Sequence, residues 1–99
     1  MRITADQAEV IRTAVREVYG EDSRLWLFGS RVDDTRRGGD IDLLVRPDSS
    51  GGGHTLMDKI RLLGKLERGL GERKIDIVIE TQDDQRPIVK IAHESGIRL

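Results

Sequence analysis

An apolar run ending in Gly29-Ser30 is followed, after nine intervening residues, by a second apolar run headed by Asp40-Ile41-Asp42. Because side chains in a β-strand alternate between two faces, Asp40 and Asp42 are expected to point the same way. At a rise of roughly 3.3 Å per residue, their Cα atoms would lie about 6.5–7 Å apart. Two carboxylates this close repel each other, so the pattern predicts a cation between them. Mg²⁺ suits such an oxygen-rich site.

A third acid, Asp76, lies in residues 74–80, where it alternates with three isoleucines. If this strand neighbours the Asp40–Asp42 strand, three carboxylates converge, and such a cluster can hold two Mg²⁺ ions roughly 3.5–4 Å apart for displacement at phosphorus. Gly29 lets the backbone approach phosphates closely, and the turn at Ser30 offers N–H groups and a hydroxyl to hold them. Nearby cations could bind phosphate oxygens: Arg31, Arg36 and Arg37.

Each of these features also has an ordinary structural explanation. A lone D-x-D is most often a solvated strand end, a lone Gly-Ser is a turn, and Asp76 alone could protect an edge strand from aggregation. The arginines are surface residues by default. The conjunction of turn, spacing, paired acids and third acid favours a phosphate-transfer site. His54 and His93 are far apart in sequence, and neither is near a plausible serine nucleophile, so a hydrolase triad is unsupported.

Hydrophobic periodicity predicts six elements in the order α-β-β-α-β-α. A capping box, Thr4 to Gln7, begins a helix that runs to about Tyr19 and stops at Gly20. The remaining elements are strands at 24–28, 40–46 and 74–80 and helices at about 55–70 and 87–95.

The second helix is expected to face the core with one apolar stripe: Leu56, Ile60, Leu63, Leu66 and Leu70. The predicted fold class is therefore α/β (α+β), with a small mixed β-sheet flanked by helices.

The length of the chain and its balance of charged residues exclude several classes of function. Residues 1–99 are expected to form a single domain, and the absence of cysteine excludes disulfide frameworks and thiolate metal sites. Lys and Arg (17) nearly balance Asp and Glu (18), which argues against direct nucleic-acid binding. No apolar run approaches the ~20 residues that span a bilayer, and no signal peptide is visible, so a cytoplasmic protein without a membrane partner is expected.

Gly29-Ser30, Asp40-x-Asp42 and Asp76 together resemble the signature of the DNA polymerase beta-like nucleotidyltransferase superfamily. The segments FGSR, GDIDLLV and LGERKIDIVIE resemble its minimal nucleotidyltransferase (MNT) branch, and the likeness covers nearly the whole chain. The gap between Ser30 and Asp40 is one residue shorter than is usual in that superfamily. This shortens the loop without removing any ligand.

The resemblance implies a protein adenylyltransferase that uses ATP and Mg²⁺, with two ions expected, to move AMP onto a hydroxyl and release pyrophosphate. The implied catalytic and metal-binding residues are Asp40, Asp42 and Asp76. The implied nucleotide-binding residues are Gly29, Ser30 and Arg31.

MNT proteins are commonly antitoxins of type VII toxin–antitoxin systems, which neutralise a HEPN-family RNase toxin by adenylylating a tyrosine. The resemblance thus implies a HEPN toxin as the partner, in a hetero-oligomer. Two alternatives stay open: an antitoxin that blocks the toxin by binding alone, and a small-molecule nucleotidyltransferase of the aminoglycoside-modifying kind. The intact set of three acids favours the enzymatic antitoxin.

Overall fold

The computed structural model describes residues 3–29, 41–48, 56–71 and 74–99. The six predicted elements are present in the predicted order, and a short strand is added at the end of the chain. The elements are α1 (Ala5–Tyr19), β1 (Arg24–Phe28), β2 (Ile41–Arg46), α2 (Leu56–Leu70), β3 (Ile75–Ile79), α3 (Pro87–Ser95) and β4 (Ile97–Arg98). Within the described residues, no helix combines the length and apolar character that crossing a bilayer requires.

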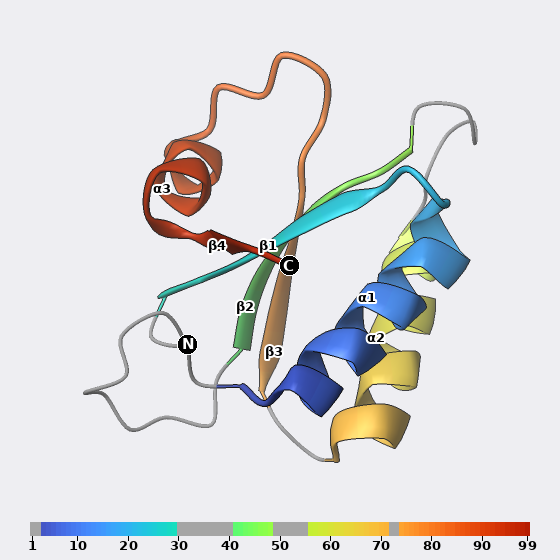
Figure 1. The fold of residues 1–99 in the computed structure, drawn as a ribbon. Helices are drawn as coiled ribbons and strands as arrows, with labels where there is room; N and C mark the ends of the chain where they lie inside the picture. Colours follow the sequence, from blue (N-terminus) through green and yellow to red (C-terminus); the bar gives the residue numbers. More distant parts are fainter. Residues whose placement is uncertain (1–2, 30–40, 49–55, 72–73) are drawn as a thin grey trace.

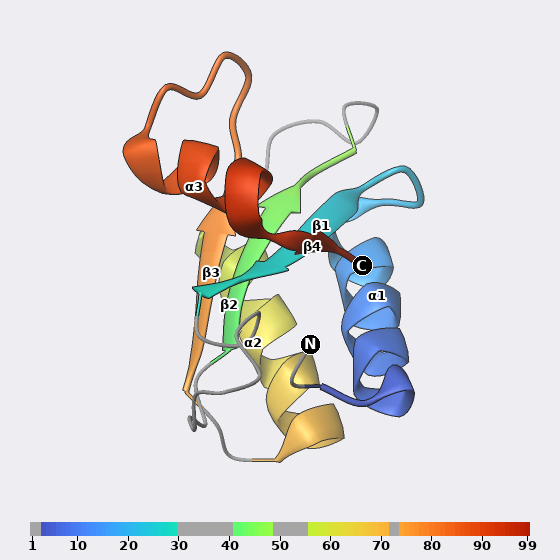
Figure 2. The ribbon, with the colours of Figure 1, turned by 60° about the vertical axis from the view of Figure 1, so that its left-hand side comes forward.

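The strands form one mixed sheet in the order β3-β2-β1-β4, as the predicted fold class requires. β1 is antiparallel to both β2 and β4, whereas β2 and β3 are parallel. The chain passes from β2 to β3 through α2, the kind of crossover that joins parallel neighbours. Helices α1 and α2 cover one face of the sheet, and α3 lies on the other face (Figures 1 and 2).

The first helix begins and ends where the sequence predicts. The Gln7 N–H donates to the Thr4 hydroxyl (3.0 Å), and the Thr4 N–H donates to the Gln7 side-chain oxygen (2.8 Å), which confirms the capping box. The helix stops at Gly20, whose φ of 108° is a conformation that other residues rarely adopt. A Cβ at Gly20 would overlap the Asp48 side chain, so glycine also lets the end of β2 pack against this turn.

The larger core lies between the sheet and the α1–α2 layer. In β1, β2 and β3, every second residue contributes its side chain to this core. Ile75, Ile77 and Ile79 therefore face the α1–α2 layer together, as predicted. Several core side chains have no exposed surface: Ile11, Val15, Leu27, Leu43, Val45, Leu62 and Leu66.

The predicted core stripe of α2 is wrong in its first half. Leu56 and Ile60 are 72% and 50% exposed, whereas Leu62 and Leu66 are fully buried. With 3.6 residues per turn, Leu56 and Ile60 lie about 80° and 120° around the helix from Leu66. The buried face is therefore rotated toward Leu62, which the prediction omitted.

The smaller core lies under α3. Val89 and Ala92 of the helix pack on Phe28 and Leu44 of the sheet, with Trp26 and Val78 at its margin. Pro87 occupies the start of α3, where its missing N–H costs nothing, as predicted. After Gly96 the chain turns into β4, which pairs with β1; this two-residue strand is too short to leave a periodic signal.

The loop between β3 and α3 is organised around Asp84, whose side chain is only 3% exposed. Its carboxylate accepts the Arg86 guanidinium (Nη2, 2.7 Å) and the backbone N–H groups of Thr81 and Arg86 (both 3.1 Å). The same Nη2 donates to the Ile79 carbonyl oxygen (2.6 Å), which ties the end of β3 to the start of α3. These bonds, led by that with the Arg86 side chain, hold the pKa of Asp84 well below its usual range.

Asp84→Asn should therefore lower the melting temperature at pH 7, and the deficit should shrink as the pH falls below about 4. A carboxylate with a lowered pKa in the folded protein stabilises above its unfolded pKa, and that contribution is lost as it becomes protonated. Circular dichroism melts across pH 2–7 measure this. Asp83→Asn is the matched control, because Asp83 makes none of these bonds in the described structure and Asn tolerates its φ of 56°. A deficit for Asp84→Asn that stays constant with pH would contradict the assignment.

Candidate active site

Asp42 and Asp76 are direct partners in the parallel ladder between β2 and β3. Residues paired in this way point to the same face of the sheet, and neighbouring strands are about 4.8 Å apart. The face is the one opposite Ile75, Ile77 and Ile79, that is, the α3 side. Two of the three predicted acids, which are 34 positions apart in the sequence, thus lie side by side. Asp40 falls outside the described residues.

Gly29 completes the described part of this site. Phe28 pairs with Asp42 across the antiparallel ladder, and Gly29 follows with a φ of 76°. A Cβ at Gly29 would overlap the Asp42 carboxylate, so the backbone runs directly against that side chain. Glycine is needed here for two reasons: the positive φ and the closeness of the carboxylate. The other predicted nucleotide-binding residues, Ser30 and Arg31, lie outside the described residues, as do Arg36 and Arg37.

Gly29→Ala should reduce the predicted nucleotide transfer far more than it reduces stability, because the new methyl group must displace the Asp42 carboxylate. The matched control is Gly71→Ala, since Gly71 has a similar φ of 82° but nothing within 4 Å of its Cβ position. Both variants should lose about 1–2 kcal/mol of stability from backbone strain. Only Gly29→Ala should also lose activity. Urea unfolding and a transfer assay on both proteins test this, and equal activities would contradict it.

The electrostatics of the acid pair differ from those of another acid on the same strand face. Glu80, at the end of β3, is bonded to His93 and lies 3.8 Å from Arg46. Asp76, by contrast, has no hydrogen-bond or ion-pair partner among the described residues, although its neighbour Asp42 carries the same charge. Neighbouring like charges favour a bound cation.

The donor chemistry of the pair fits Mg²⁺. Carboxylate oxygens are hard ligands, and the two carboxylates face one side of the sheet beside Gly29, whose missing side chain leaves room for the Asp42 carboxylate. Within the described ranges, no group of three or more His, Cys, Asp or Glu side chains could hold a metal ion. Asp40, the third predicted metal ligand, lies outside those ranges.

His93 has a structural role on the α3 side of the sheet. Its ring stands edge-on to Trp26, with ring centroids 4.5 Å apart at an angle of 77°, and it bonds to Glu80. Trp26, His93 and Glu80 thus join β1, α3 and β3 on the face that carries the acids. The bond between Glu80 and His93 joins residues of different elements, and no pattern of sequence spacing predicts it.

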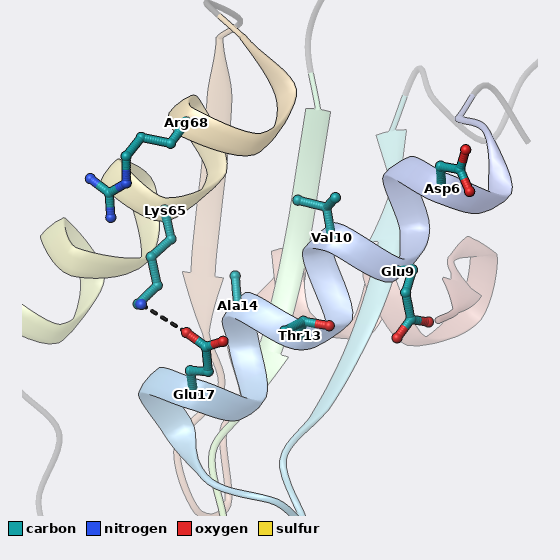
Figure 3. A pocket seen from close by; sticks show the side chains of 8 residues that line it. All are labelled: Asp6, Glu9, Val10, Thr13, Ala14, Glu17, Lys65 and Arg68. Atoms are coloured by element: carbon teal, nitrogen blue, oxygen red, sulfur yellow. Dashed lines mark hydrogen bonds and ion pairs between the residues drawn. The ribbon is translucent and has the colours of Figure 1, made fainter.

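An open cavity of about 530 Å³ is a separate feature. It lies between α1 and α2 (Figure 3). These helices cover the face of the sheet opposite the acid pair. Val10 and Ala14 point into it, and Glu17 accepts a hydrogen bond from Lys65 (2.8 Å), which lowers the pKa of Glu17. The carboxylates and cations that line it are mixed, so it presents no concentrated charge.

A comparison with known protein families shows the family to which the chain belongs. The family described as "Polymerase beta, Nucleotidyltransferase" matches residues 16–99. The chain belongs to this nucleotidyltransferase family. The match runs from the last turn of α1 through every strand, so it includes Gly29 and both acids of the ladder. A search of curated proteins finds no match to the chain.

Membership of the nucleotidyltransferase family agrees with the fold. The four-stranded mixed sheet with α1 and α2 on one face and α3 on the other is consistent with a polymerase beta-like core. In a nucleotidyltransferase, an acid pair beside a glycine turn is the expected place for phosphate chemistry. The chain is thus a nucleotidyltransferase domain.

Proposed function

We propose that this nucleotidyltransferase is an antitoxin that transfers AMP from ATP to a tyrosine hydroxyl of a cognate HEPN-family RNase toxin and thereby neutralises it. The observation that carries the enzymatic part is the direct pairing of Asp42 with Asp76 beside Gly29. The MNT-like segments around these residues support the choice of acceptor. A chain of this size has no room for a separate acceptor-binding domain within residues 1–99.

The reaction displaces pyrophosphate at the α-phosphorus of ATP. The acceptor oxygen forms a bond to that phosphorus, the bond to the bridging oxygen of the β-phosphate breaks, and the hydroxyl proton is released. Asp42 and Asp76, together with Asp40, would hold Mg²⁺, which when bound supplies positive charge to the phosphate oxygens. Gly29 leaves space for the Asp42 carboxylate, and the exposed Asp76 lies on edge strand β3, where an acceptor can approach.

The test is transfer of label from ATP to the partner protein. A candidate partner is the product of a neighbouring open reading frame that carries an R-x-x-x-x-H motif. With the partner and Mg²⁺ present, label from α-³²P-ATP should remain on the partner after denaturing electrophoresis, and label from γ-³²P-ATP should not. Omitting Mg²⁺ or replacing the acceptor tyrosine with phenylalanine should abolish the signal.

The outcomes separate the alternatives. A partner that binds tightly and is silenced without acquiring label would identify a binding-only antitoxin. Label on aminoglycosides, with none on the partner, would identify a small-molecule nucleotidyltransferase. Either result overturns the proposed protein acceptor.

A further inference from the structure

Helix α3, which lies on the same face of the sheet as the acid pair, exposes two large apolar side chains. Val89 and Ala92 of this helix are buried against the sheet, whereas Ile88 and Ile91 are 40% and 51% exposed. Ile88 and Ile91 are three residues apart, so they are neighbours on the helix surface. These two isoleucines are called the apolar edge of α3. Leaving them in water costs free energy that contact with an apolar group would recover.

Helix α3 crosses the strands and does not run along them (Figure 2). Its start is tied to β3, because the Arg86 guanidinium donates to the Ile79 carbonyl oxygen. Its end leads into β4, which forms the other edge of the sheet. One flank of the helix therefore faces the end of the sheet at which β3 begins, and the other flank faces the end at which β3 stops.

His93 marks the flank of α3 that faces the end of β3. Its ring bonds to Glu80, which directly follows the last residue of that strand. Asp76 lies near the start of β3, in register with Asp42 and, through it, with Phe28. Phe28 itself packs under α3. The flank opposite His93 therefore faces the row of the sheet that holds the acid pair.

The apolar edge lies on this opposite flank. Val89 and Ala92 define the direction in which the helix is buried. At about 100° per residue, His93 lies about 70° to one side of this direction, and Ile88 lies about 70° to the other side. Ile91 lies on the same side as Ile88, about 130° from the buried direction. The apolar edge is thus turned toward the acid pair and the solvent beside it.

The order of the strands separates the side of the nucleotide from the side of the acceptor. Gly29, the turn at which the phosphates of ATP are expected, follows β1, and β2 and then β3 lie beyond it in the sheet. In an in-line displacement, the acceptor and the departing pyrophosphate lie on opposite sides of the α-phosphorus. The acceptor is therefore expected on the side of β3, where Asp76 is exposed and α3 begins.

We propose that Ile88 and Ile91 contact the aromatic ring of the acceptor tyrosine and thereby position its hydroxyl at the acid pair. A tyrosine side chain combines a large apolar ring with a polar end, which matches an apolar edge beside two carboxylates. A serine or threonine acceptor has no ring to cover this edge. The inference rests on the proposed function, since it names the residues by which that site selects its acceptor.

The experiment measures KM and kcat for the full chain with ATP, Mg²⁺ and the candidate partner from the neighbouring reading frame. The double variant Ile88→Gln with Ile91→Gln should raise the KM for the partner at least about tenfold, because amides of similar size replace the apolar surface. The KM for ATP and the melting temperature should stay close to those of the parent, since neither side chain is buried. Ile60→Gln is the matched control, because Ile60 is 50% exposed on α2, which covers the other face of the sheet. It should match the parent in all these values.

The outcomes separate this inference from the proposed function. If the parent labels the partner and the double variant has the same KM for it, the apolar edge does not bind the acceptor, and the proposed function stands. A raised KM for ATP, with that for the partner unchanged, would assign the edge to the adenine base and also overturn the inference. Absence of label with the parent itself would overturn the proposed function, and this inference with it.

Discussion

Asp76→Asn should lower AMP transfer by about 10²–10³-fold or more, while the protein remains folded. The change removes one charge at nearly constant volume from a pair whose members are direct partners on β2 and β3. Loss of a single group that stabilises charge in the transition state typically costs this much in rate. Because Asp76 has no ion-pair partner among the described residues, its removal breaks no observed bond and relieves repulsion from Asp42. Transfer rates and urea unfolding curves on the same preparations measure both effects.

The control for this experiment lies four residues along the same strand face. Glu80→Gln also removes one carboxylate charge, but Glu80 is already bonded to His93 and lies near Arg46. We expect Glu80→Gln to lower the free energy of unfolding. The rate of transfer should fall severalfold at most. If Glu80→Gln abolished transfer and Asp76→Asn left it intact, the acid pair would not be the catalytic centre.

Leu43→Ala should destabilise the protein by about 2–5 kcal/mol, a large part of the roughly 5–15 kcal/mol that holds a small domain folded. Leu43 is fully buried in the middle of β2, where it belongs to the core beneath α1 and α2. It also lies next to Asp42, so loss of this anchor should disturb the acid pair at temperatures where the protein remains largely folded. Urea unfolding measures the free energy of unfolding.

Leu56→Ala is the matched control for the core prediction, because the same side chain is deleted from a position that is 72% exposed. A surface change of this kind should cost less than about 0.5 kcal/mol. The comparison also tests the rotated face of α2. If Leu56→Ala lowered the free energy of unfolding by several kcal/mol, Leu56 would have to be buried, and the apolar stripe that the sequence predicted would be correct.

Much of the local structure could be predicted from short-range patterns. The reciprocal bonds of Thr4 and Gln7, the stop at Gly20 and the start at Pro87 depend on residues within one helical turn, and all three are found as predicted. The alternation of the three isoleucines in β3 likewise needs only the period of a strand. Such signals are decided by neighbours in the sequence, and they survive in any compatible fold.

The rotation of α2 could not be predicted in the same way. Leucine and isoleucine are spread over about 160° of the circumference of this helix, at 3.6 residues per turn, so periodicity alone does not choose which part of this wide apolar face is buried. Burial of Leu62 rather than Ile60 is decided by where the helix lies against α1 and the sheet. Strand β4 and the bonds around Asp84 were missed because each depends on a tertiary neighbour rather than on a repeat.

The sequence by itself determined the candidate acids, the glycine turn and the order of elements, since each is a property of residue type and spacing. Only the tertiary structure decided that Asp42 and Asp76 are partners, because the register of a parallel pair joined through a helix is not set by local turn geometry. Residue type and spacing identify the candidate site residues, and the long-range pairing of β2 with β3 brings Asp42 and Asp76 together.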